Sequence, residues 1–450
     1  MQFTEEQIEG LAANAAAIKA GKKLTSKSGW DFYAKSDRVI WGAIKGSGKN
    51  PYTIQVDILN LAYKCSCPSR QFPCKHGLAL LFLYVQEKGD FVIKEEPDDI
   101  KAWLGKRDAK LVPKEVSNDE LTEDQIEKRA KGKVKRQKDR EKFINSGIEE
   151  LILWLRDVVR LGILDLPNKD YRFFENVALR MVDAKASGLA GRVRELSAIN
   201  YSLGDQWQNE VIESIGRTYL LLKSYQNSLQ KKQKPLQGML KGLIGQNLST
   251  KELLEDETAL HVKDQWLVLG SIKEALEKER LVVAYTWLLG LETNQDAILI
   301  AFETPFNTAT ELTLFNGSIL EAELVFYPDP VPHRAVITGQ VATTQELIKI
   351  PKFKLNWIAA HHQKVAWLKL NPWVNNKISL VENVYFLKLN DQWIVSDQEQ
   401  NYRAIIENFP NDKLMKALFL GESPFHIAVI EKENSVYPIG VFNQQKYYPL

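Results

Sequence analysis

The spacing of apolar residues along the chain predicts helices and strands in separate blocks. An N-terminal helix is expected after a capping box at Thr4 and Gln7, because apolar residues then recur at helical intervals. From Trp30 to Tyr63 the pattern changes to short aromatic and β-branched runs with glycine and proline between them, which is typical of a β-hairpin. A helix follows at roughly Leu78–Gln86, and because it is apolar nearly all round we expect it to be buried.

The rest of the chain changes from charged to helical to strand-rich. An amphipathic stripe begins at Ile148, a long helix is expected around Trp207–Leu222, and Ser249 with Glu252 forms another capping box. One helix is predicted near residues 354–369, among strands expected at WLVLG, AILIAF, AELVFY, RAVITGQV, VYFLKL, QWIV, HIAVI and YPIGVF. We therefore predict an α+β multidomain chain with an N-terminal module over 1–93, a charged linker or helix extension over 94–145, a helical domain over 146–260 and a mostly β domain over 261–450.

Composition narrows the class of protein only slightly. With 450 residues, 44% hydrophobic and 26% charged, the chain is expected to form two to four globular domains. No apolar run is long enough to span a bilayer, and the N-terminal sequence lacks a secretory signal, so we expect a cytoplasmic protein. The net charge of +2 means that nucleic-acid binding would need a local patch; residues 128–142 offer one, with nine Lys/Arg against Asp139 and Glu141. A solvated helix face is the alternative interpretation of that run.

The most specific signal is a group of cysteines beside a histidine. The three cysteines of the chain lie within ten residues, in the order Cys65-x-Cys67 followed by Cys74-x-His76. Alternate residues of a strand share a face, so the first two sulfurs can reach one ion, and Pro68 is expected to end that strand. An odd number of cysteines argues against a disulfide framework. Three sulfurs and one imidazole suit tetrahedral zinc, and four protein ligands leave no open position, so the predicted site is structural.

Two other interpretations of these residues are weaker. Ordinary buried thiols beside a core histidine would not need the interleaved CxC and CxH pattern. A catalytic Cys–His pair would not need three cysteines, nor two of them on one strand face.

At these residues the sequence resembles the SWIM zinc finger, whose signature is CxC, a variable spacer and CxH. It is most similar to the bacterial, stand-alone branch of SWIM proteins. Further stretches carry the resemblance, the last three more weakly: Trp41-Gly42, Gly46-Ser-Gly48, Pro51-Tyr52, Val56-Asp57, Arg180–Ala184, Gly188–Ala190 and Phe326–Pro328. The resemblance implies a ββα-like unit in which Cys65, Cys67, Cys74 and His76 bind one zinc ion.

The resemblance also implies partners. SWIM domains are proposed to bind DNA or proteins, and bacterial members are associated with MoxR-type AAA+ ATPases and von Willebrand factor A-type proteins. A protein-interaction adaptor is therefore the first functional hypothesis. The second is a nucleic-acid-binding protein that uses the zinc module and residues 128–142, with phosphate contacts tested first at Lys45, Lys49, Arg70 and Lys75.

The remaining sequence gives no support for catalysis. The GSGK at residues 46–49 lacks the first glycine and the final Ser/Thr of a phosphate-binding loop, so a hairpin turn is expected there. Adjacent His361 and His362 point in different directions on a helix and cannot form an i, i+4 ligand pair. Seven aromatic residues of the module could stack on bases but are expected mostly in the core. They are Trp30, Phe32, Tyr33, Trp41, Tyr52, Tyr63 and Phe72. We expect the chain not to be an enzyme; one in its C-terminal half has no residue evidence behind it.

Overall fold

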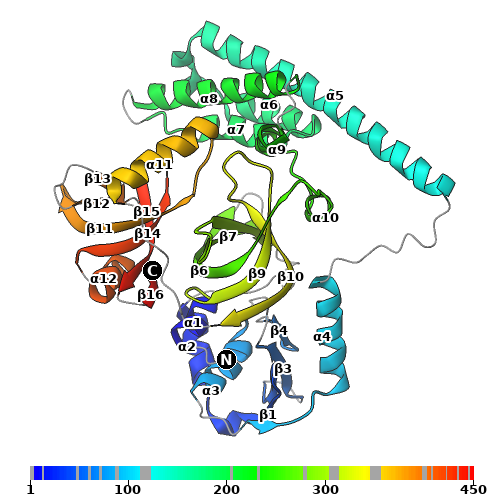
Figure 1. The fold of residues 1–450 in the computed structure, drawn as a ribbon, viewed down its shortest axis with the longest axis vertical. Coiled ribbons are helices and arrows are strands. Elements are labelled where there is room, and N and C mark those ends of the chain that lie inside the picture. The colour runs from blue at the N-terminus through cyan, green and yellow to red at the C-terminus, as the bar shows by residue number, and fades with distance from the viewer. Residues whose placement is uncertain are drawn as a thin grey trace. The chain divides into compact units, whose positions relative to one another are not determined.

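The structure is a computed structural model. It describes residues 5–12, 15–46, 50–58, 62–69, 73–86, 91–111, 123–202, 206–230, 234–276, 281–303, 314–344, 356–397, 403–406, 409–421, 423–432, 435–443 and 446–450. These residues form two compact units, shown in Figure 1. The first takes its residues from Met1–Lys114, His261–Phe326 and His333–Leu450, and the second from Glu115–Leu260 and Tyr327–Pro332.

An antiparallel sheet forms the framework of the N-terminal module. Its strands are β1 (Trp30–Lys35), β2 (Val39–Ile44), β3 (Tyr52–Asp57), β4 (Ala62–Cys65) and the short β5 (Val92–Ile93), in the order β4-β3-β2-β1-β5. Only β5 runs parallel to its neighbour. The predicted hairpin is confirmed as β2 paired with β3, although residues 47–49 of its turn lie outside the described residues.

Helices surround this sheet. They are α1 (Glu5–Leu11), α2 (Ala15–Lys23), a 3-10 turn η1 (Lys27–Gly29), α3 (Lys75–Val85) and α4 (Asp98–Leu111). The central α3 is buried from His76 to Leu83, which confirms the expectation from its all-apolar sequence. The sequence did not predict α4, because Ile100 and Leu104 are the only buried residues among those of its side chains that the structure describes. They pack against Val39 and Trp41. Thr4 of the first capping box lies outside the described residues.

The second unit is helical. It contains α5 (Glu123–Leu161), a 3-10 turn η3 (Ile163–Asn168), α6 (Tyr171–Asp183), α7 (Ser187–Ala198), α8 (Gln206–Ser228), α9 (Lys234–Ile244) and α10 (Thr250–Leu254). The 39 residues of α5 take in the basic run, which is therefore a helix extension. Its stripe buries Ile148, Leu151 and Leu155. The predicted capping box at Ser249 and Glu252 is confirmed.

A five-stranded barrel begins the C-terminal half. Its strands are β6 (Leu260–Leu276), β7 (Leu281–Gly290), β8 (Asp296–Glu303), β9 (Ile319–Phe326) and β10 (Ala335–Thr344), paired in the order β10-β9-β6-β7-β8. A parallel bridge between Ile298 and Arg334 closes β8 onto the start of β10. The strand order around the barrel, with its third and fifth strands parallel, is that of a Greek-key barrel of the OB type.

A second sheet completes the chain. It contains β11 (Ile378–Leu389), β12 (Gln392–Ser396), β13 (Arg403–Ile406), β14 (Phe425–Glu431), β15 (Ser435–Asn443) and β16 (Lys446–Pro449), with α11 (Trp357–Leu370) and α12 (Asn411–Leu420) beside it. The α+β class, the helical middle and the mostly β C-terminal region are confirmed. Four elements of the C-terminal half were not predicted from the sequence: β7 of the barrel, β13 and β16 of the second sheet, and helix α12.

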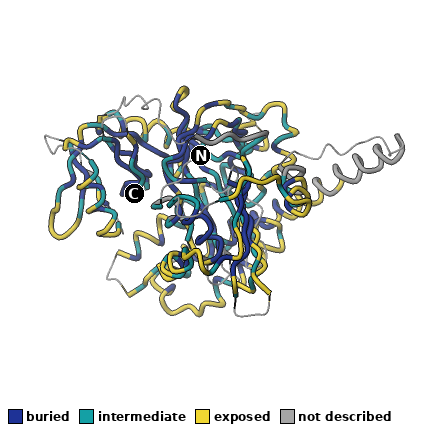
Figure 2. Tube along the Cα trace, turned by 90° about the horizontal axis from the view of Figure 1, so that it is seen from below, coloured by how far each residue is buried: buried dark blue, intermediate teal, exposed yellow. Residues whose placement is uncertain are grey.

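Buried positions run along the strands of both C-terminal sheets. Figure 2 marks the buried residues of the chain in dark blue. Barrel residues such as Leu267, Trp287 and Ile298 share one core with Leu380 and Phe442 of the second sheet. The barrel has its own interior as well, which contains Trp266 and Phe326 among other residues. The C-terminal sheet therefore covers part of the outer face of β6, β7 and β8, while Phe302 of β8 stays half exposed.

Candidate metal centre

The first pair of cysteines lies where β4 ends. The sequence predicted that the strand ends at Pro68. In the structure it ends earlier, because Cys65 is the last residue of β4. The pairing with β3 nevertheless continues for one more residue, because the Ser66 amide donates to the Thr53 carbonyl at 3.0 Å. The Thr53 amide in turn donates to the Ser66 hydroxyl at 3.0 Å. These two bonds hold the residue between the cysteines against β3.

The second pair lies at the start of α3. Cys74 is the N-cap residue, with extended backbone dihedrals, and His76 is the second residue of the helix. The Leu78 amide donates to the Cys74 carbonyl at 3.0 Å, so the helix begins directly behind the sulfur. Both side chains are buried, whereas Cys65 and Cys67 are half-buried. A helix N-terminus favours a negative charge, which suits a thiolate at this position.

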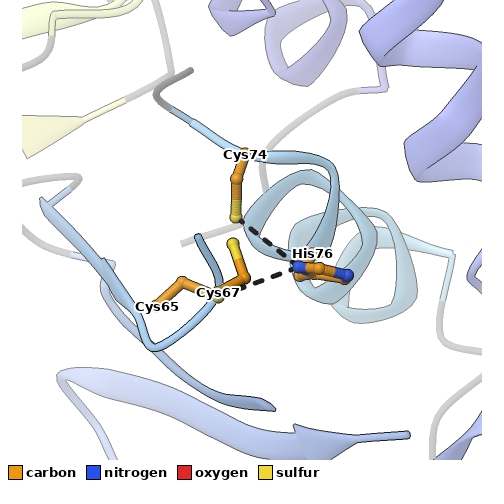
Figure 3. A group of neighbouring side chains, drawn as sticks. All are labelled: Cys65, Cys67, Cys74 and His76. Atoms are coloured by element: carbon orange, nitrogen blue, oxygen red, sulfur yellow. Dashed lines mark hydrogen bonds between the residues drawn. The ribbon is translucent and has the colours of Figure 1, made fainter. Parts of the chain in front are cut away.

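The four side chains converge on one point (Figure 3). Their ligand atoms all lie within 4.8 Å of one another. Nδ1 of His76 is 3.9 Å from Sγ of Cys65 and 4.0 Å from Sγ of Cys74. Around tetrahedral zinc, with Zn–S of about 2.3 Å and Zn–N of about 2.0–2.1 Å, a sulfur and a nitrogen lie about 3.6 Å apart. The cluster therefore fits one zinc ion after small movements of the side chains.

The electrostatics of the sulfurs also suit a cation. The hydrogen bond from the Cys65 thiol lowers the pKa of Cys74 to about 4, with His76 and the Gly77 amide as further causes. The same hydrogen bond, together with burial, raises the pKa of Cys65 well above its usual range. Burial raises the pKa of Cys67. Cys74 is therefore the sulfur whose surroundings most favour the thiolate that a cation binds.

Zinc ligation by these residues would be structural. Three thiolates and one imidazole complete a tetrahedral set, which leaves no position for water or substrate. When bound, zinc supplies a cross-link between the end of β4 and the start of α3, and such links contribute on the order of 10 kcal/mol to the folding of small modules. Among the described residues, these four form the one group of three or more Cys, His, Asp or Glu side chains placed to share an ion.

Two of the four residues expected to contact phosphate, Lys45 and Lys75, lie within the described residues. Lys45 is exposed, and its ammonium lies 3.8 Å from the Asp31 carboxylate. Lys75 is exposed at the first position of α3. Lys49 and Arg70 lie outside the described residues. The structure thus leaves the two described lysines of this set at the surface of the module.

One neighbour of the metal ligands was not assigned a role from the sequence. The ring of Tyr52 lies tilted against the imidazole of His76, with centroids 5.1 Å apart and an angle of 37° between the planes. The sequence placed Tyr52 among aromatic residues that fill the core or stack on bases. Periodicity alone could not identify this contact, because Tyr52 and His76 are 24 residues apart and belong to different elements.

Comparison with known protein families identifies two domains. The SWIM zinc finger family matches residues 53–84, and the SWIM-associated four-helix bundle domain matches residues 139–244. The first match contains the four candidate ligands, and the second covers most of the helical unit. No curated protein and no solved structure matches the chain. None of the helices in the described part of the chain combines the length and apolar content that a membrane crossing requires.

Proposed function

We propose that this chain, in which a SWIM zinc finger and a SWIM-associated four-helix bundle share one polypeptide, is a protein-interaction adaptor and not an enzyme. The observation that carries the proposal is the complete set of four protein ligands at the candidate zinc site. Such a site stabilises a small module and has no position for a reacting molecule. The zinc is then a structural element of a docking module.

An exposed apolar edge on the same module supports docking of a protein. Val92 and Ile93 form the edge strand β5, with relative exposures of 52% and 79%, and Phe32 on neighbouring β1 is 49% exposed. Apolar residues clustered at an exposed sheet edge are typical of protein-binding surfaces. We take this edge, defined as Phe32, Val92 and Ile93, as the contact surface of the adaptor.

For the partner we propose a MoxR-type AAA+ ATPase or a von Willebrand factor A-type protein of the same host. This choice rests on the resemblance to bacterial SWIM proteins. The test is direct binding between the purified, zinc-loaded full chain and each purified candidate. A dissociation constant that Ile93→Lys weakens at least about tenfold, a loss of about 1.4 kcal/mol, would support the edge as the docking surface.

Two variants make that test specific. Leu161→Lys is the matched control, because Leu161 is 81% exposed but lies in the helical unit. It should leave binding unchanged. Cys74→Ser should abolish binding together with zinc content. Equal binding by the wild type and Ile93→Lys would contradict the proposed surface, and the absence of binding to both candidates would contradict the proposed partners.

Nucleic-acid binding is the second candidate function, and a specific observation favours it. Within α5, the side chains of Lys135, Lys138, Arg140 and Lys142 are all exposed. By helical spacing Lys135, Lys138 and Lys142 share one face, which also carries the exposed Asp139, while Arg140 lies on another face. A lysine-rich face of this kind can contact phosphates, whereas a merely solvated helix face would bind no nucleic acid.

Salt dependence separates these two interpretations. If the chain binds nucleic acid through this surface, its affinity for labelled DNA or RNA should fall steeply with salt. Replacing Lys135 and Lys138 by Gln should reduce the slope of log K against log salt by roughly two. Fluorescence anisotropy of the full chain measures both quantities. A flat salt response, or no binding at low salt, would remove this candidate.

A further inference from the structure

The structure gives the metal-binding histidine a defined orientation. Nδ1 of His76 faces the sulfurs of Cys65 and Cys74, and the other ring nitrogen points away from them (Figure 3). An imidazole can present either nitrogen to a metal, and groups outside the ligand set decide which one is presented. Something in the fold must therefore hold the ring of His76 in this plane.

Tyr52 is in the position to do so. Its ring lies 5.1 Å from the His76 imidazole between centroids, at an angle of 37°. Tyr52 is the first residue of β3 and packs against the core of the zinc module. Because the strand fixes its backbone through pairing with Ile44, the tyrosine provides a rigid surface against one face of the imidazole.

Gly46 also limits the position of the tyrosine ring. A Cβ placed on residue 46 would lie 2.4 Å from Cε2, 2.8 Å from Cδ2 and 3.0 Å from Cζ of Tyr52. These distances are below van der Waals contact, so any side chain at this position would displace the ring. The glycine that begins GSGK thus has a packing reason unrelated to phosphate binding.

The next residue of β3 secures the other half of the site. Thr53 exchanges two hydrogen bonds with Ser66, which lies between Cys65 and Cys67. Consecutive residues of β3 therefore contact His76 and the residue between the two cysteines. We propose that Tyr52, limited by Gly46, is a positioning residue that holds the His76 ring with Nδ1 toward the zinc position, while Thr53 holds the cysteine pair.

The proposal is tested on the full chain by zinc affinity and by the visible absorption of its cobalt-substituted form. Tyr52→Ala should weaken zinc binding about 10- to 100-fold, the usual effect of removing a group that orients a metal ligand. It should also change the cobalt spectrum, which reports the geometry of the ligands. Tyr52→Phe keeps the ring and should restore both the affinity and the spectrum of the wild type.

Substitutions of Gly46 provide a second, independent test of the proposal. Gly46→Ala should weaken zinc binding, whereas Gly29→Ala in the same module should not, because a Cβ at residue 29 meets nothing within 4 Å. In a Tyr52→Ala background the Gly46→Ala substitution should have no further effect, since the ring it displaces is gone. If Tyr52→Ala fails to fold, the cobalt spectra of Gly46→Ala and Gly29→Ala decide the question.

Several results would overturn the proposal. One is a folded Tyr52→Ala chain with wild-type zinc affinity and cobalt spectrum. A second is a Tyr52→Phe chain as impaired as Tyr52→Ala, since the hydroxyl and not the ring would then matter. Additive effects of Gly46→Ala and Tyr52→Ala, or equal cobalt spectra for Gly46→Ala and Gly29→Ala, would also contradict it.

Discussion

At the scale of single residues, zinc binding at the candidate site depends on the protonation states of its three cysteines. The hydrogen bond from Cys65 stabilises the Cys74 thiolate and lowers its pKa to about 4. The pKa values of Cys65 and Cys67 are raised, so both remain thiols at neutral pH. Zinc binds thiolates, and its binding must therefore displace the remaining thiol protons.

The zinc affinity of the chain should consequently rise with pH. Between about pH 7 and 8, binding releases about two thiol protons, because Cys74 is already ionised, so affinity should increase about 100-fold per pH unit. Acid favours the protonated, metal-free site, and the zinc-dependent stability of the module should decline as the pH falls. Competition against a chelator of known pH dependence measures the slope. A thiol-proton release of three would show that Cys74 is protonated as well.

At the scale of elements, close helix packing in the second unit depends on a glycine. A Cβ on Gly188 in α7 would lie 2.3 Å from the Leu243 carbonyl oxygen of α9 and 2.8 Å from the Gly245 amide nitrogen. Backbone atoms cannot move aside as a flexible side chain could. Gly191, one turn later on the same helix, has open space around the corresponding position.

The two glycines should therefore respond in opposite directions to the same substitution. Gly188→Ala forces α7 and α9 apart and should destabilise the helical unit by about 1–3 kcal/mol. Gly191→Ala should stabilise it by up to about 1 kcal/mol, because alanine is the better helix former. Native-state hydrogen exchange of the α7 amides measures both changes within the full chain. Similar effects of the two substitutions would contradict the packing argument.

At the scale of the whole molecule, the barrel and the C-terminal sheet form a continuous structure. The Trp287 indole donates to the Asn376 carbonyl at 2.8 Å, and the Tyr447 hydroxyl donates to the Leu269 carbonyl at 2.7 Å. The β7–β8 face, through which OB-type barrels bind oligonucleotides, is largely buried by this contact. Any nucleic acid is therefore expected on the zinc module and α5, and not on the barrel.

A buried ion pair joins the same two parts. Lys377, just before β11, pairs with Asp296 at the start of β8, and both side chains are nearly inaccessible to solvent. Lys377→Met leaves a buried carboxylate without its cation and should destabilise the fold by about 3–5 kcal/mol. Thermal unfolding of the full chain measures this loss.

Two control variants test whether the effect of Lys377→Met comes from leaving a buried charge without its partner. Adding Asp296→Leu to Lys377→Met should recover much of the lost stability, because no uncompensated charge then remains. Lys388→Met removes an exposed partner of Asp391 and should change the stability little. A small effect of Lys377→Met would show that the pair is not buried in solution.

The sequence by itself determined the zinc ligands, the buried α3 and the alternation of helical and strand-rich regions. These features are local, since CxC and CxH spacing brings two ligand pairs to the ends of neighbouring elements, and an apolar period identifies a helix within a few turns. The hairpin of β2 and β3 was predictable for the same reason. Cys65, Cys67, Cys74 and His76 come together as their spacing indicated.

Only the tertiary structure decided the features that depend on distant partners. β7 is buried on both faces, with Leu288 in the barrel interior and Trp287 in the shared core, so its sequence lacks the alternation that identifies a strand. The charged α4 buries two apolar residues against a sheet formed some 60 residues earlier in the chain. The role of Tyr52 follows from its contact with His76. Local sequence periods record which face of an element is apolar, but they do not record what covers that face.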